Sequence, residues 1–344
     1  MSAGGEPALT AVLAERLARV EPLRRAALRT ELLRLAAYGA AGLAFLALLP
    51  ATAVGSMWLL GNYVTQNLAI VVPAMLAAVA GVIALAIVTF KRLTRWRATP
   101  DADYRAAFRS MVIAPTLREA LPDFVIDSAP AFDAAAFDAS ALFAPADDRH
   151  EVSLALTGTI DGQRLRIWVL RVWRHGYSHD RKQSVDVTIF RGLQVHAPAS
   201  LAMRGTVRVV SRHEYEGGDR PEWGVVRRGG TVRVTQPVDG LPHEAALVLD
   251  EGMTDPPPVA AALAGAWPSL RAAMATAAPA FASVNAGGLY AAWATPASHR
   301  AALEAELSAP NNADELARET VALQRAVAAT AQAAARCFAA SSTP

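Results

Sequence analysis

A long run of apolar residues near the N-terminus is the strongest pattern in the chain. From Leu35 to Phe90 there is no Asp, Glu, Lys or Arg, and the only polar interruption is segment 61–67. The runs on either side, about 35–60 and 68–90, each exceed the roughly 20 residues that an α-helix needs to cross a bilayer. The pattern therefore predicts a two-helix transmembrane hairpin over residues 35–90. We expect this hairpin rather than a buried helical pair, because buried helices rarely run so long without a charge.

A cleaved signal peptide is the other alternative for this run, because Ala51-Thr52-Ala53 has the small residues of a cleavage site. The apolar run continues past it, however, and a charged segment of 34 residues precedes the run, so we expect no cleavage. That first segment, 1–34, reads as an amphipathic helix that packs on the folded domain or on another subunit. Pro22 is expected to bend it. Its apolar stripe comprises Leu9, Val12, Leu13, Leu17, Val20 and Leu23.

Basic residues flank the apolar run on both sides and are absent from its central loop. Basic flanks stay in the cytoplasm during membrane insertion, so both termini are predicted to be cytoplasmic. The excess of Arg over Lys is typical of a GC-rich bacterial genome and is not a sign of nucleic-acid chemistry. The hairpin is expected in a bacterial inner (plasma) membrane. The flanking residues are Arg16, Arg19, Arg24, Arg25, Arg29 and Arg34 before the run, and Lys91, Arg92, Arg95 and Arg97 after it.

After residue 98 the pattern changes to strands. Apolar and polar residues alternate over 151–160 and 163–174, and the intervening Asp161-Gly162 is a strong hairpin turn. Further strands are expected at 185–189, 207–209, 225–226, 232–234, 245–249 and 281–292, with a bulge at Arg191-Gly192. Helices are expected at 104–121 with an interruption near Pro115, at 129–145, 258–278 and 297–307, and from an N-cap at Asn312 onward.

These elements predict an α+β fold, in which one cytosolic domain, 98–344, has a mainly antiparallel sheet and flanking helices and ends in a long helix. The domain holds 23 basic and 27 acidic residues, so nucleic acid is not an expected partner. The whole chain has 344 residues, of which only 19% are charged, and a mean hydropathy of +0.23, which excludes a disordered chain and argues against a wholly soluble one. A single cysteine, Cys337, excludes a disulfide scaffold and a cysteine-based zinc cluster.

Several short motifs together resemble a family of bacterial membrane proteins that carries only a domain-of-unknown-function label. The motifs are 137–143 (FDASALF), Thr157-Gly158, 190–193 (FRGL), 205–207 (GTV), Val284-Asn285 and Leu289-Tyr290. The resemblance covers about residues 10–310 and implies a short N-terminal segment, two membrane helices and a cytosolic α+β domain. The chain departs from the family pattern at Leu154, Arg171 and Arg174, where acidic residues are usual. The resemblance implies no catalytic residues.

Candidate chemistry is sparse, and we assign no catalytic, cofactor-binding or metal-ligating residue and expect no cofactor. His175, His179 and Asp180 have a metal-like spacing, but they fall in an expected loop rich in cations, which disfavours a metal dication. No G-x-S-x-G motif is present, and Gly229-Gly230 falls far short of a phosphate-binding loop. Segment 215–220 lacks the spacing of a calcium loop. Cys337 is expected to be a small packing residue.

Two classes of function follow from this pattern. The first is a membrane-anchored cytosolic binding, regulatory or scaffold module, and the second is a ligand- or lipid-binding domain or an enzyme whose site is dispersed in sequence. The expected partners are the lipid bilayer and other proteins, including a second copy of the chain. Self-association is expected through the small residues Ala77 and Gly81 or through the stripe Leu316, Leu323 and Val327, although core packing also explains that stripe.

Overall fold

The computed structural model of the chain describes residues 5–63, 68–95, 99–127, 131–143, 149–178, 183–211, 232–234, 241, 245–250, 253, 258–274, 280–295 and 312–342. It divides into two compact units. The first comprises Met1–Leu13, Ile113–Glu304 and Asn312–Pro344, and the second comprises Ala14–Val112 and Ala305–Asn311.

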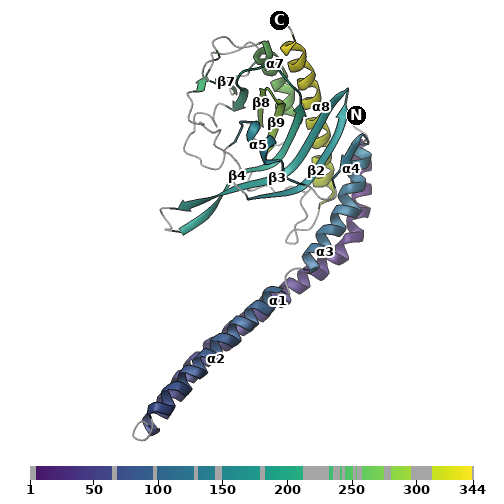
Figure 1. Cartoon of the computed structure of the whole chain (residues 1–344). Helices are drawn as coiled ribbons and strands as arrows, with labels where there is room; N and C mark the ends of the chain where they lie inside the picture. Colours follow the sequence, from purple (N-terminus) through teal and green to yellow (C-terminus); the bar gives the residue numbers. More distant parts are fainter. Residues whose placement is uncertain are drawn as a thin grey trace. The chain divides into compact units, whose positions relative to one another are not determined.

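Helices make up the described part of the second unit (Figure 1). They are α1 (Gly5–Tyr63), which begins in the first unit, α2 (Leu68–Arg95), α3 (Thr99–Phe108) and the π-helix η1 (Arg109–Ile113). Helix α1 runs without a break across the expected boundary at residues 34 and 35, because Arg34-Leu35-Ala36-Ala37 are all good helix formers. It also continues through Pro22 and Pro50. The helix interruption expected near Pro115 is observed as the π-helix η1, which ends at Ile113, shortly before this proline.

The amphipathic stripe of α1 is narrower than the sequence indicates. Leu13, Leu17 and Val20 are buried, but Val12 and Leu23 are more than two-fifths exposed. Arg24 is also buried and binds Glu21 through Nε at 2.7 Å. This hydrogen bond, together with a second one from Arg25 and the charges of both arginines, lowers the pKa of Glu21 to about 2.

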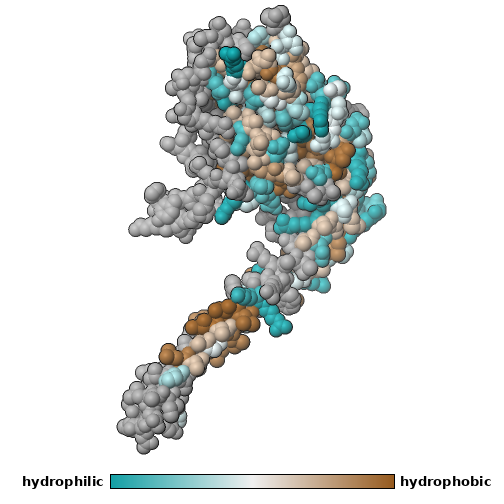
Figure 2. Space-filling view, in the orientation of Figure 1, coloured by the Kyte–Doolittle hydropathy of each residue, from teal (hydrophilic) through white to brown (hydrophobic). Residues whose placement is uncertain are grey.

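The apolar part of α1 is exposed on its surface. One helical stretch of the described residues, Pro7–Thr52, is long and apolar enough to cross a membrane, and only 6% of its most apolar window is buried. Leu43 and Leu46 are 70% and 65% exposed, so this stretch is not the core helix of a soluble fold. The described apolar stretch of α2 is shorter, Ala80–Thr89. Figure 2 shows apolar surface along this helical region.

A nine-stranded sheet forms the centre of the first unit, in the order β1-β2-β3-β4-β9-β8-β5-β7-β6, and every strand pair is antiparallel. The α+β class with an antiparallel sheet and flanking helices is therefore confirmed. The strands are β1 (Phe124–Ile126), β2 (His150–Ile160), β3 (Gln163–Ser178), β4 (Gln183–Pro198), β5 (Val207–Ser211), β6 (Val232–Val234), β7 (Ala245–Asp250), β8 (Ala280–Asn285) and β9 (Gly288–Ala294).

Several strands differ from the sequence prediction. The single strand expected at 281–292 is the hairpin β8–β9, because Asn285-Ala286-Gly287-Gly288 makes a turn in which Gly288 has φ 122°. The bulge lies at Ile189, which has no partner on β3, and not at Arg191-Gly192. Strand β3 extends to Ser178, four residues farther than expected. The strand expected at 225–226 and the helix expected at 297–307 lie outside the described residues.

Helices cover the two faces of the sheet differently. Helices α7 (Pro258–Ala273) and α8 (Ala313–Ser341) pack on one face, where the indole Nε1 of Trp293 donates to the carbonyl oxygen of Leu270 at 2.9 Å. The short helix α5 (Ala134–Ala139) packs on the other face, and α4 (Ala114–Ala120) contacts α8. Asn312 caps α8 as predicted. Leu316, Leu323 and Val327 of α8 are buried in the fold. Core packing therefore explains their regular spacing.

Candidate functional site

A row of polar side chains crosses the sheet under α5. Its members are cross-strand neighbours on five adjacent strands, so their side chains point to the same face. The neighbouring row, which includes Trp168, Ala292 and Val210, is almost wholly apolar. The polar row comprises Arg166 (β3), His196 (β4), Tyr290 (β9), Ser283 (β8) and Arg208 (β5).

One half of the polar row binds the C-terminal end of α5, where backbone carbonyl groups lack helical partners. The Oγ of Ser283 donates to the carbonyl oxygen of Ser140 at 2.5 Å, and Nε of Arg208 donates to that of Ala141 at 2.8 Å. Next to the row, Nδ2 of Asn285 donates to the carbonyl oxygen of Ala139 at 2.6 Å. The cation of Arg208 also suits the negative end of the helix dipole.

Each end of the row contains an ion pair. At the α5 N-terminus, the carboxylate of Asp133 caps the helix by accepting from the backbone N–H of Ala136 at 2.9 Å. The same carboxylate lies 3.3 Å from Nη1 of Arg166. At the opposite end of the row, Nη1 of Arg208 lies 2.6 Å from Oδ1 of Asp250. The polar row therefore holds α5 to the sheet at both ends of the helix.

His196, in the polar row, is the member with unused bonding capacity. Its ring stacks on that of Tyr290, with centroids 4.1 Å apart and planes 4° apart, and the ring of Trp168 lies 6.5 Å away on a nearly parallel plane. The Nε2 atom lies 3.1 Å from the carbonyl oxygen of Gly287, which assigns the proton to Nε2. The Nδ1 atom is then a buried acceptor, and no described group bonds to it.

Burial sets the charge state of this pair of rings. It lowers the pKa of His196, and it raises the pKa of Tyr290. Both side chains are therefore neutral at pH 7. A neutral imidazole with a free Nδ1 can accept a hydrogen bond or a proton, but only 5% of His196 is exposed.

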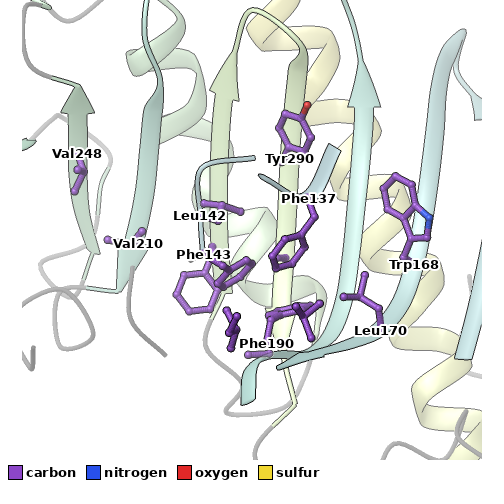
Figure 3. Packing of buried hydrophobic residues seen from close by; sticks show 14 of the residues in the cluster. Phe137, Leu142, Phe143, Trp168, Leu170, Phe190, Val210, Val248 and Tyr290 are labelled. Carbon is purple, nitrogen blue, oxygen red and sulfur yellow. The ribbon is translucent and has the colours of Figure 1, made fainter. Parts of the chain in front are cut away.

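An aromatic cluster packs on the same face and includes Phe137, Phe143 and Phe190, which Figure 3 labels. Phe281 belongs to the same cluster. The ring centroid of Phe143 lies 5.6 Å from that of Phe137, 4.5 Å from that of Phe190 and 5.2 Å from that of Phe281. All four rings are buried. Packing of this kind holds α5 and the sheet together as one core.

Of the residues weighed from the sequence, the structure describes His175 and Cys337, which lie on different elements. His175 lies in β3 opposite Asp186, rather than in a loop, while His179 and Asp180 lie outside the described residues. Cys337 is buried in α8, and burial raises its thiol pKa to about 12. Within the ranges that the structure describes, no group of three or more His, Cys, Asp or Glu side chains could hold a metal ion.

Sequence reasoning missed His196, which counted only as one of several scattered histidines. A local signal exists, because Gln194 and His196 are the polar alternates of a strand whose other members, Leu193, Val195 and Ala197, are apolar. Polar residues in such a strand indicate a solvent-facing side, yet both are at least 95% buried. Comparison of the chain with family models, with curated proteins and with solved structures finds no match.

Proposed function

We propose that the chain is a two-pass protein of the bacterial inner membrane whose sheet domain is a cytosolic binding, regulatory or scaffold module. The observation that carries the proposal is the exposure of large apolar side chains along α1 and α2, such as Leu43, Val54, Leu76 and Leu85, each at least 60% exposed. Burying one such side chain is worth about 1.5–3 kcal/mol. A bilayer supplies this burial for both helices at once.

The charge pattern supports the orientation. Arg29 and Arg34 precede the apolar run, Lys91 and Arg92 follow it, and residues 61–67 between the spans carry no charge. Moving one arginine to the bilayer centre costs at least about 2.5–3.5 kcal/mol. An arrangement with both termini in the cytoplasm avoids this cost for every flanking cation.

The packing under α5 supports binding rather than catalysis. The charged and hydroxyl groups of the polar row hold α5 in place, and the aromatic cluster fills the rest of that face. A binding role then uses the outer surface of the domain. The alternative, a ligand- or lipid-binding domain or an enzyme with a dispersed site, is favoured by one observation, the free Nδ1 of buried His196.

The domain-of-unknown-function family is proposed as the group to which the chain belongs. In support, two glycines of its motifs lie where the neighbouring chain leaves no space for a side chain. A Cβ on Gly158 would lie 2.5 Å from the carbonyl oxygen of Asp123, and one on Gly192, where φ is 152°, would overlap that of Trp293. The motif 137–143 contains α5 residues and the carbonyl groups that the polar row binds.

Self-association through the membrane helices is a further part of the proposal. Gly81 of α2 has nothing within 4 Å of the place of a Cβ, and Ala77 is exposed on the same helix. Such a small-residue surface leaves room for a second helix. Cross-linking in native membranes should yield a dimer that Gly81→Leu weakens, and a monomer alone would contradict it.

Reporter fusions test the topology. A C-terminal green fluorescent protein should be bright and a C-terminal alkaline phosphatase inactive, and the reverse pattern would overturn the cytosolic placement. A fusion at residue 64, in the expected outer loop, is the matched control and should give active phosphatase. Affinity purification from detergent-solubilised membranes then tests the binding role. A co-purifying small molecule that His196→Ala removes would instead favour the ligand-binding or enzymatic alternative.

A further inference from the structure

Two polar atoms without hydrogen-bond partners lie on the same buried strand. They are the amide Nε2 of Gln194 and the imidazole Nδ1 of His196, for which the described part of the chain supplies no donor or acceptor. Only 1% of Gln194 and 5% of His196 is exposed. Buried polar groups in folded proteins almost always bond to protein or to ordered water, because an unpaired one destabilises the fold. Two such atoms on β4 therefore point to a bound molecule.

Gln194 is the exception in a row of apolar side chains. Residues two apart on a strand point to the same face, so Gln194 and His196 belong to neighbouring rows across the sheet. The cross-strand members of the Gln194 row are Ala155, Trp168, Gln194, Ala292, Phe281, Val210 and Ala246. All the other members are apolar. A polar residue at this position has a physical reason if it shares a partner with His196.

Stacking and one hydrogen bond set the direction of the His196 ring. Tyr290 lies directly opposite His196 on β9, and the two ring planes are 4° apart, so the imidazole plane runs along the strand rather than across it. Its Nε2 is directed at the carbonyl oxygen of Gly287, 3.1 Å away, at the C-terminal end of β4. Nδ1 belongs to the opposite edge of the ring. It therefore faces back along β4, toward Gln194.

The spacing between the two side chains suits one bridging oxygen atom. Their Cα atoms are two residues apart, a separation of about 6.6 Å along an extended strand. An oxygen that bonds to both nitrogen atoms, at about 2.8–3.0 Å each, spans at most about 6 Å between them. The two nitrogen atoms are not within bonding distance of each other. A single oxygen atom therefore completes both groups, and no larger ligand is needed.

We propose that a buried water molecule bridges Nε2 of Gln194 and Nδ1 of His196. Its oxygen accepts a hydrogen bond from the amide, and one of its O–H groups donates to the imidazole. Water also suits the amide turned by 180°, because it can donate to both side chains, whereas the hydroxyl group of an organic molecule donates only once. Both residues are at least 95% buried, so the packing favours the smallest molecule of this class. The bridge makes the free Nδ1 a part of the domain core, independently of the membrane anchor.

Water cross-peaks in nuclear magnetic resonance test the bridge in the full chain. The protein is labelled with ¹⁵N at glutamine, histidine and tryptophan and is held in deuterated detergent micelles. We expect the side-chain amide protons of Gln194 to give a nuclear Overhauser cross-peak to water, with the sign that a long-lived bound molecule produces. Gln194→Met identifies these signals by their loss. The indole N–H of Trp293 is the matched control, because it is buried and donates to the carbonyl oxygen of Leu270, and it should give no such cross-peak.

Removal of the imidazole nitrogen atoms separates the bridge from its alternatives. His196→Phe keeps a ring at this position, and the water cross-peak of Gln194 should be lost; its persistence would overturn the bridge. A scalar coupling between Nε2 of Gln194 and Nδ1 of His196 would overturn it in favour of a direct hydrogen bond. A cross-peak to carbon-bound protons of a co-purifying molecule would overturn water in favour of an organic ligand. If His196→Phe does not fold, the spectra of the unaltered chain decide, because a Gln194 amide without a water cross-peak contradicts the proposal.

Discussion

Arg208 should be the most costly polar residue to remove from the α5 contact. It is 7% exposed, donates from Nε to the carbonyl oxygen of Ala141 and pairs through Nη1 with Asp250. Arg208→Met keeps the apolar stem and removes both interactions. The substitution leaves the carbonyl group of Ala141 and the carboxylate of Asp250 without the guanidinium.

The expected loss follows from these two bonds. A hydrogen bond to a charged group contributes about 1.5–3 kcal/mol. Breaking a buried ion pair costs about 3–5 kcal/mol, but the side chain of Asp250 is 35% exposed and still accepts from the backbone N–H of Thr206 at 2.9 Å, so the pair is worth less here. We expect Arg208→Met to lower the free energy of unfolding by about 3 kcal/mol, or Tm by about 6–12 °C for a domain of this size.

Urea and thermal unfolding of the full chain in detergent, followed by circular dichroism, measure this loss. Arg164→Met is the matched control, because Arg164 is exposed on β3, and it should change stability by less than about 0.5 kcal/mol. Hydrogen exchange at Leu142 should rise in Arg208→Met and not in the control. Ser283→Ala should add less in the Arg208→Met background than alone, because both residues bind the end of α5. A loss no larger than that of the control would refute the assignment of Arg208.

Other expectations concern the core and the buried titratable groups. Phe143→Ala should cost about 3–5 kcal/mol in urea unfolding and Phe143→Leu much less, because the first opens a cavity between three aromatic rings; equal costs would contradict this packing. Folding lowers the pKa of His196, so the unfolded chain binds more protons than the folded chain below about pH 6.5. The free energy of unfolding should therefore be highest above about pH 6.5 and should decrease as the pH falls through the lowered pKa. The same pH series on His196→Gln should show a shallower fall, and an unchanged slope would exclude this residue as the cause. With a pKa of about 12, the thiol of Cys337 should resist maleimide at pH 8 until urea unfolds the chain, whereas fast labelling of the folded protein would contradict its burial.

The sequence by itself determined the features that depend on neighbours along the chain. Alternation with Asp161-Gly162 predicted the β2–β3 hairpin, whose turn residues have φ of 50° and 77°. Asn312 predicted the start of α8, and the uncharged run from Leu35 predicted long apolar helices. Turn geometry, capping and helical hydropathy are local properties, because each depends on residues a few positions apart.

Only the tertiary structure decided what lies beside what. The chain returns from β5 and β7 to insert β8 and β9 between β4 and β5, a strand order that no local pattern records. The polar row exists only because of this order, since it joins Arg166, His196 and Tyr290 from three separate segments. The same holds for Arg171, whose cross-strand partners are Glu151 on β2 and Arg191 on β4. Register and burial arise from contacts between distant segments, and for that reason the sequence could show these residues but not their arrangement.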